Sequence, residues 1–362
     1  MSAMVATKGP TSGRDYGYGN ARVRGMRSRL LTPQFFDELM AAHDLNRIIQ
    51  ALIDTEYGPF IETAIIKGRT PAAMDEALRD NMVTTFQKVI HFLNAEAFEL
   101  VGTLLGRWDL FNVKSIIRGK HMHLRAEEIE DGLYAVGSLT PTDLHLLVGL
   151  EDVRAVVDTL VTWESPYAVP LRENIAAYGE GGNLATLELA LDRYYFGWAS
   201  KRLSGHRQNF KLARRILGLQ ADSVNLLTVF RLLKSDIGDV DPKSFYLPGG
   251  EYVTEELFDS LAAMSDVDEV LDGLKKTPYA RQLEAVIATY VDEGSLSVFE
   301  RALEDFVMRK ALDAGRGDPL GIGITIGYLW AKQNEITNLR IIIKGTSVGM
   351  PPDRMRKELI LV

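Results

Sequence analysis

The sequence predicts an all-α protein built from three tandem helical domains of similar structure. Three observations lead to this prediction. Asn112, Asn225 and Asn338 lie 113 residues apart, each within a copy of one short pattern. An aspartate followed by a short amphipathic segment recurs in three places as well. Finally, the chain shows no sustained alternation of apolar and polar residues joined by tight turns, so strand signals are scarce.

Each asparagine-centred pattern predicts a helix with its asparagine on the apolar face. An acidic residue lies three positions before each asparagine, and because acids favour the first turn, we expect the helix to begin at or just after it. Apolar residues at +1, +4 and +5 share one helical face with the asparagine. Each amide should be buried or half-buried and hydrogen-bonded, since an unpaired one costs roughly a few kcal/mol. The acids are Asp109, Asp222 and Glu335, and the apolar sets are Val113/Ile116/Ile117, Leu226/Val229/Phe230 and Leu339/Ile342/Ile343.

A second element begins at Asp44, Asp152 and Asp266. In each copy the aspartate precedes apolar residues at +1, +4, +5 and +8, which predicts a capped short helix. An aromatic residue follows: Tyr57, Tyr167 and Tyr279. Two elements in a fixed order support a true repeat more strongly than one.

Between these elements the sequence predicts a longer helix. It is clearest over 83–104, where apolar residues alternate spacings of three and four over about six turns. Lys243–Tyr252, with its Pro-Gly-Gly segment, is expected to be a loop at a domain join. The repeat therefore divides the chain into a disordered tail and three helical domains: 1–15, 16–130, 131–245 and 246–362.

Composition narrows the functional classes. The chain has 362 residues, 46% of them hydrophobic, a formal net charge of −8 and no cysteine. The charge argues against nucleic-acid binding, and the missing thiols exclude disulfides and suit a reducing cytoplasm. The beginning of the chain lacks an apolar signal segment. The most apolar stretch, 320–331, is shorter than the roughly 20 residues of a membrane span, so we expect a buried helix packed closely through its glycines.

The search for catalytic, cofactor or metal residues yields none. Asp44 in the His43-Asp44 pair is better explained as a helix cap, and His121-Met122-His123 as a loop, because no further ligand completes a metal set. The glycines between Gly321 and Gly327 lack the spacing and the Lys-Ser/Thr of a phosphate loop. Arg316-Gly317-Asp318 is expected to be a helix-ending turn.

One basic segment contrasts with the acidic chain. It contains Arg22, Arg24, Arg27 and Arg29. These side chains could contact an acidic partner or lipid head groups, or they could form a solvated helix face paired with acids of the same chain.

The segments Tyr18–Arg24, Gly327–Leu329, Glu335–Arg340 and Pro351–Pro352, with the asparagine-centred helices, resemble the C subunit of archaeal and bacterial V/A-type rotary ATPases. That family is related to the d subunit of eukaryotic vacuolar ATPases. The resemblance extends from about Tyr16 to Val362.

This resemblance implies a funnel of three similar domains about a pseudo-threefold axis, without an active site. It implies a peripheral position on the cytoplasmic face of the membrane, between the proteolipid ring and the D and F subunits of the central stalk. A protein in this position transmits torque for ATP-coupled proton or sodium ion transport.

Two alternatives remain at this point. A helical adaptor that binds other soluble proteins would also lack catalytic residues. An all-α enzyme acting on a lipid-like or phosphorylated substrate would need clustered acids or histidines, which the sequence does not show.

Overall fold

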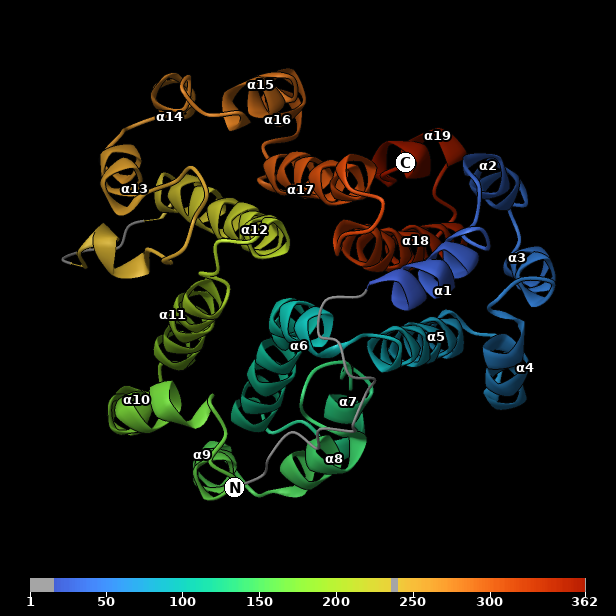
Figure 1. Ribbon diagram of the computed structural model, residues 1–362, viewed down its shortest axis with the longest axis horizontal. Helices are drawn as coiled ribbons and strands as arrows, with labels where there is room; N and C mark the ends of the chain where they lie inside the picture. The colour runs from blue at the N-terminus through green and yellow to red at the C-terminus, as the bar shows by residue number, and fades with distance from the viewer. Residues whose placement is uncertain (1–15, 236–239, 362) are drawn as a thin grey trace. The chain divides into compact units, whose positions relative to one another are not determined.

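The computed structural model describes residues 16–235 and 240–361, and every regular element within these ranges is a helix (Figure 1). The predicted all-α class is confirmed. The tail predicted at 1–15 lies outside the described residues. The chain divides into two compact units: the described residues up to Glu99 together with those from Ala311 onward, and Leu100–Lys310. The division into three domains about a pseudo-threefold axis stays a prediction.

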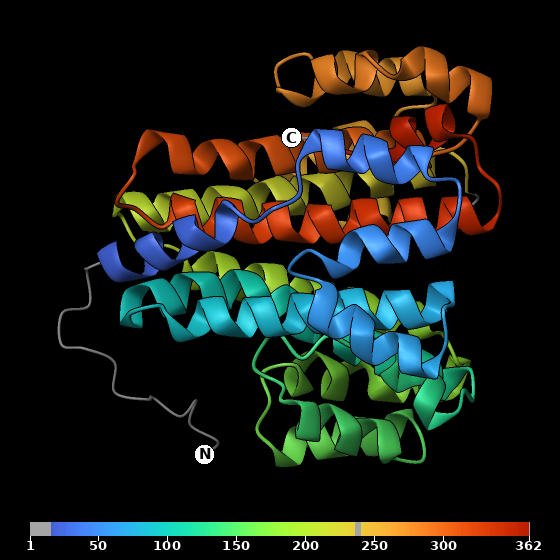
Figure 2. The same ribbon diagram turned by 90° about the vertical axis from the view of Figure 1, so that its right-hand side faces the viewer.

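The first unit joins the two ends of the chain. The long helix α18, drawn in red, packs against α1, α2, α3 and α5 of the N-terminal part (Figures 1 and 2). Its helices are α1 Gly17–Arg27, α2 Pro33–Ala41, α3 Leu45–Ile53, α4 Gly58–Lys67, α5 Pro71–His91, α18 Gly323–Ser347 and α19 Pro352–Glu358.

The second unit contains two sets of short helices, each following a long one. Two helices cross the unit boundary, α6 Ala95–His121 and α17 Ser297–Gly317. The other elements are α7 Ala126–Glu130, α8 Pro141–Gly149, α9 Val153–Thr162, α10 Ala168–Gly181, α11 Leu184–Arg202, α12 Gln208–Leu232, the 3₁₀ helix η1 Pro242–Phe245, α13 Glu255–Ala262, α14 Val267–Gly273, α15 Tyr279–Glu284 and α16 Ile287–Glu293.

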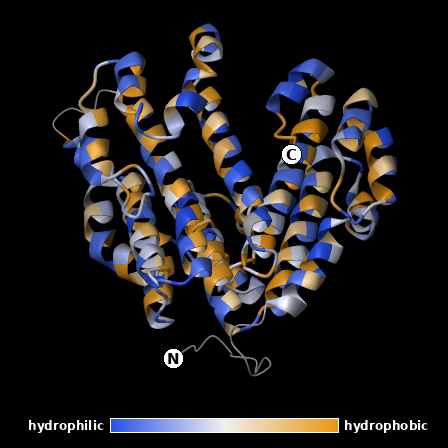
Figure 3. Cartoon of the chain, turned by 45° about the horizontal axis from the view of Figure 1, so that its top comes forward, coloured by the Kyte–Doolittle hydropathy of each residue, from blue (hydrophilic) through white to orange (hydrophobic). Residues whose placement is uncertain are grey.

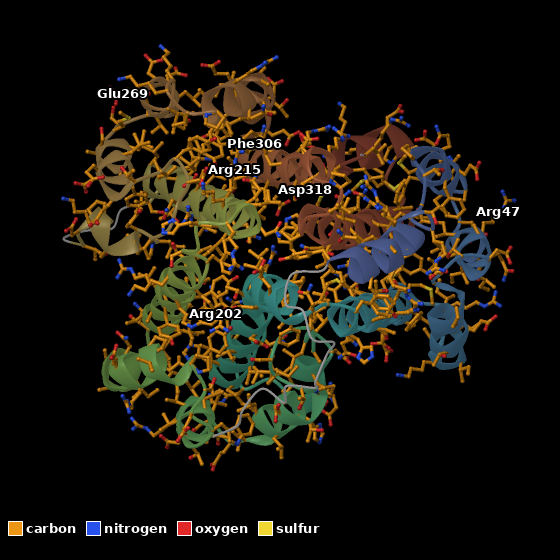
Figure 4. All side chains as sticks on the ribbon, viewed as in Figure 1. Arg47, Arg202, Arg215, Glu269, Phe306 and Asp318 are labelled. Atoms are coloured by element: carbon orange, nitrogen blue, oxygen red, sulfur yellow. The ribbon has the colours of Figure 1, made fainter. Side chains whose placement is uncertain are left out.

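The three aspartate caps are confirmed. The Asp44 carboxylate accepts the N–H of Asn46, two residues on, at 2.9 Å, and Asp152 and Asp266 accept the N–H three residues on at 2.8 and 2.9 Å. Each capped helix buries its apolar side and leaves polar residues in solvent, as Arg47 on α3 illustrates (Figure 4). Since an N-cap satisfies one of the free N–H groups of the first turn, these positions fix where α3, α9 and α14 begin.

The single helix predicted over 83–104 is wrong. The chain forms two helices there, because α5 ends at His91 and α6 begins at Ala95. Asn94 separates them: its side-chain oxygen accepts the Ala97 N–H at 2.9 Å, which caps α6. Apolar residues keep the same spacing on both sides of the break, so periodicity alone did not reveal it.

The predicted starts of the asparagine-bearing helices are also wrong. Helices α6, α12 and α18 begin more than ten residues before their acids, which therefore lie in helix interiors. Acids at these positions predict helix starts, because the free N–H groups of a first turn attract them. In the structure they bind N–H groups of other segments instead, as described below.

Helices α17 and α18 approach each other closely through glycine. A Cβ built on Gly323 would lie 2.2 Å from the Ala314 carbonyl oxygen, and one on Gly327 would lie 3.2 Å from that of Ala311. The predicted close packing is confirmed from Gly323 onward, whereas Leu320, at the start of the predicted stretch, precedes the helix and is 68% exposed. Helix α17 ends at Gly317, so the predicted helix end is confirmed, but Arg316 and Gly317 still belong to the helix and the turn follows Asp318.

Along the helices, hydrophobic and hydrophilic residues are interspersed (Figure 3). Among the described residues, no helix combines the length and apolarity needed to cross a membrane.

Candidate functional site

The three repeated asparagines form three equivalent pairs of buried hydrogen bonds. Each side-chain amide donates to the backbone carbonyl of the residue 22 positions later and accepts that residue's N–H. The partners are Tyr134, Leu247 and Ile360, and the donating bonds measure 2.6, 2.9 and 2.9 Å. All three asparagines are at most 1% exposed. The prediction of buried, hydrogen-bonded asparagines is confirmed.

The acids three positions earlier bind backbone as well, in the first two copies that of the same segment and in the third copy that of the N-terminal part. Each accepts the backbone N–H of the residue directly before a threonine that caps the next short helix. The acid, the N–H residue and the capping threonine are Asp109, Leu139 and Thr140; Asp222, Val253 and Thr254; and Glu335, Leu31 and Thr32. We call each buried acid–asparagine pair with its bound backbone a polar node, numbered one to three along the chain.

A hydroxyl supplies a further donor in every node. The Tyr279 hydroxyl donates to Asp222 at 2.8 Å in node two, and the Tyr57 hydroxyl donates to Glu335 at 2.7 Å in node three. In node one the Ser138 hydroxyl donates to Asp109 at 2.7 Å. There the repeated tyrosine, Tyr167, donates instead to the Gly106 carbonyl at 2.8 Å.

Glycine permits the close approach of backbone to aspartate. A Cβ on Gly137 would lie 2.3 Å from the Asp109 carboxylate, and one on Gly250 would lie 2.3 Å from Asp222 Oδ1. A side chain at either position would therefore clash with the acid. This explains part of the Pro-Gly-Gly sequence in the loop predicted at Lys243–Tyr252, a region that begins with η1.

Node three differs because it binds both ends of the chain. In nodes one and two a single continuous segment contacts both the asparagine and the acid. In node three Asn338 binds Ile360 near the C-terminus, whereas Glu335 accepts the N–H of Leu31 at 2.5 Å. Helix α18 thus joins the first and last described segments where the other copies have an unbroken chain.

A buried lysine is present in node three alone. At the position three residues before the acid, node one has Gly106, node two Leu219 and node three Lys332. The Lys332 ammonium lies 2.8 Å from Glu335 Oε1 and 2.8 Å from the Tyr57 hydroxyl. It is 3% exposed, and burial lowers its pKa. Without its carboxylate partner this charge would be strongly destabilising.

Burial also determines the protonation of the acid in node two. It raises the pKa of Asp222 to about 6, although the N–H groups of Tyr252 and Val253 and the Tyr279 hydroxyl oppose the rise. An unfolded aspartate titrates near pH 3.9. The folded state therefore binds the proton more tightly, and its stabilising contribution is complete below about pH 4 and is lost as pH rises through about 6.

This shift predicts a pH-dependent loss of stability that Asp222→Asn removes. Between pH 4.5 and 7.5, the wild type should lose stability relative to the variant, since the variant has no proton to release. Urea unfolding of both proteins at several pH values measures the difference. Asp292→Asn, at an exposed acid, is the matched control. Parallel pH profiles for wild type and Asp222→Asn would contradict the prediction.

The four arginines lie on α1 and the turn after it, and all are exposed. Three also make contacts within the chain. Arg22 lies 4.7 Å from the Phe92 ring centroid, Arg24 donates to the Pro319 carbonyl at 2.6 Å, and Arg29 pairs with Glu56 at 3.0 Å.

The loop that Arg24 contacts also contains Asp318 (Figure 4). Asn20, on α1 as well, donates to the Gly321 carbonyl in that loop at 3.0 Å. Helix α1 is thus held firmly while its arginine side chains remain accessible, and a role for them in partner binding stays a prediction.

The histidine segments that were considered as metal sites have local structural explanations. Asp44 caps α3, and His121 ends α6 with its Nδ1 atom 2.9 Å from the Tyr178 hydroxyl. His123 follows in the turn with a φ of 55°.

Comparison with known proteins identifies the family of this chain. The model of the ATP synthase (C/AC39) subunit family matches residues 19–358. The chain belongs to this family. It is 29% identical to the C subunit of the A-type ATP synthase from Methanocaldococcus jannaschii over 95% of this chain and 86% of the relative. The same protein from Methanothermobacter thermautotrophicus is 29% identical over 95% and 87%, and that from Methanosarcina mazei 27% identical over 96% and 93%. In this ATP synthase C/AC39 protein, the matched range covers all three polar nodes apart from Ile360.

Sequence reasoning missed the capping threonines. Thr32, Thr140 and Thr254 each lie twelve residues before one of the repeated aspartates, so the signal was present. The role of these threonines is recognised only in the structure, where the acids of the nodes bind the N–H groups of the residues before them.

Proposed function

We propose that this protein is a non-catalytic part of the central rotor, connecting the central stalk to the proteolipid ring and transmitting torque between them. The observation that carries the proposal is the family match over 19–358. In this role the chain takes part in ATP-coupled transport of protons or sodium ions without binding nucleotide.

The polar nodes support a mechanical role. Each node ties a long helix to the start of a short-helix set through several buried hydrogen bonds. Buried, fully paired polar groups fix one arrangement of the elements they join, and close-packed helices deform little. A torque-transmitting body needs that stiffness. The recurrence of one node in three copies favours the predicted pseudo-threefold arrangement.

The proposed partners are the proteolipid ring and the D and F subunits of the stalk, with the chain peripheral to the cytoplasmic face of the membrane. A three-copy body on a ring with a different number of protomers cannot make identical contacts all round. We therefore expect many modest polar contacts. The exposed arginines of α1 are candidates for such contacts.

Reversing the charge of Arg22, Arg24, Arg27 and Arg29 to glutamate should weaken assembly. Each lost interface charge contact contributes up to about 1 kcal/mol, so retention of partner proteins should fall about tenfold or more. The measurement is isolation of the tagged chain from membranes with identification and quantification of every retained protein. The wild-type arm tests the proposed function itself, because a rotor component must retain ring and stalk proteins.

A matched control reverses four exposed arginines elsewhere: Arg47, Arg154, Arg172 and Arg281. It changes the net charge equally, and circular dichroism checks that both variants fold. Equal retention by the α1 variant and the wild type would show that α1 makes no essential rotor contact.

A further inference from the structure

A cavity of about 400 Å³ lies in the unit that contains both chain ends. Its walls come from the end of α1, the α3–α4 turn with the start of α4, the middle of α5 and the start of α18. A volume of this size is within the range of small-molecule sites. The family comparison assigns no role to it.

One buried polar atom of the cavity lining, Asn81 Oδ1, has no hydrogen-bond partner. Asn81 is 2% exposed; its amide nitrogen donates to the Glu56 carbonyl at 3.0 Å, but its Oδ1 is unpaired. Tyr328, which also lines the cavity, is 3% exposed. Buried polar groups in folded proteins are nearly always paired, so Asn81 Oδ1 needs a water or a ligand.

The charges of the lining are positive, unlike those of the chain as a whole. Arg29, Lys88 and Lys332 line the cavity together with one acid, Glu56. Glu56 pairs with Arg29 at 3.0 Å, and Lys332 pairs with Glu335 at 2.8 Å, so these two cations are already compensated. Lys88 forms no ion pair within the described residues, and the hydroxyls of Thr84 and Thr85 are one turn away on the same helix. A cation without an ion pair, beside two hydroxyls, favours an anion.

Two lining residues depart from the repeat. Where α18 has Tyr328, the positions 113 and 226 residues earlier hold Arg215 and Gly102. Lys332 likewise stands where the other nodes have leucine or glycine, although node two is complete without a lysine. The Tyr328 hydroxyl and the Lys332 ammonium are therefore not required by the repeated framework, and both residues line the same cavity.

We propose that this cavity binds the phosphate group of a small molecule. Lys88 and Arg29 would contact the phosphate oxygens at the mouth, and the Tyr328 hydroxyl would donate from within. A monohydrogen phosphate or an adjoining hydroxyl supplies the donor that Asn81 Oδ1 lacks. A phosphate fits this set because it offers several acceptor oxygens and one proton. The inference does not depend on the rotor role, since the lining residues belong to one unit.

Binding to the purified full-length chain tests the proposal by calorimetry and thermal unfolding. The probes are inorganic phosphate, glycerol 3-phosphate, and phosphatidylcholine vesicles with and without phosphatidylinositol 4-phosphate, with chloride at equal ionic strength as reference. Saturable binding of a soluble phosphate identifies a metabolite as the source. Binding only to vesicles that contain the phosphorylated lipid identifies a head group.

Lys88→Gln should weaken binding of the effective probe about tenfold or more, because it removes a charge-assisted hydrogen bond. Lys344→Gln removes an equal charge from exposed α18 surface outside the cavity and should bind as the wild type does. Equal weakening by both variants would reveal general charge screening and overturn the proposal. Absence of binding to every probe, or a crystal structure grown in phosphate with ordered water alone in the cavity, would overturn it as well.

Discussion

Replacing Glu335 with alanine should lower the free energy of unfolding by about 3–5 kcal/mol, the usual cost of leaving a buried charge without its partner. The side chains of Lys332 and Glu335 are 4% and 5% exposed. Without the carboxylate, the ammonium keeps only the Tyr57 hydroxyl, and the Leu31 N–H loses its acceptor. The loss should concentrate in the unit that joins the two ends of the chain.

A matched variant separates the lysine from the node. Lys332→Leu installs the residue that node two has at this position and leaves Glu335 with the Tyr57 hydroxyl and the Leu31 N–H. We expect it to cost much less than Glu335→Ala. Urea unfolding followed by circular dichroism measures both. If Glu335→Ala stayed within about 1 kcal/mol of the wild type, the node would not stabilise the chain ends.

The sequence repeat predicted the local structure where the interaction is short-range. The aspartate caps at Asp44, Asp152 and Asp266 depend on backbone two or three residues away, so composition and spacing were sufficient. The apolar stripe beside each asparagine followed from helical periodicity in the same way. In both cases the residues that determine the local structure are close together in the sequence.

The long-range partners could not be predicted by such reasoning. Asp109 and Glu335 looked like helix caps because a sequence pattern shows the attraction of an acid for free N–H groups, but not which N–H groups. Leu31, the partner of Glu335, is 304 residues away. Similarly, the break at Asn94 does not interrupt the apolar spacing, so a periodic pattern runs across it.

The two candidate sites differ in the same way: one can be predicted from the sequence and the other cannot. The basic segment of α1 is visible from composition, because its arginines are close in the sequence. The cavity is not visible, since its walls come from four separated segments and one of its features is the absence of a partner for Asn81 Oδ1. Absence of a partner is a property of the folded chain alone.

Rotation of this protein during ATP hydrolysis is the second large effect that we expect. The chain contains no cysteine, so one introduced thiol provides a unique attachment point for a probe. Val291 on α16 is 72% exposed and lies outside the polar nodes, which makes Val291→Cys suitable. A rotor component turns with the stalk, whereas a stationary one keeps its orientation relative to the soluble head.

Single-molecule observation of that probe on the assembled complex, immobilised through the soluble head, tests the rotor assignment most directly. We expect continuous rotation in one direction that requires ATP, and a probe attached to a head protein provides the stationary control. A probe on this chain that stays fixed while the stalk rotates would contradict the account.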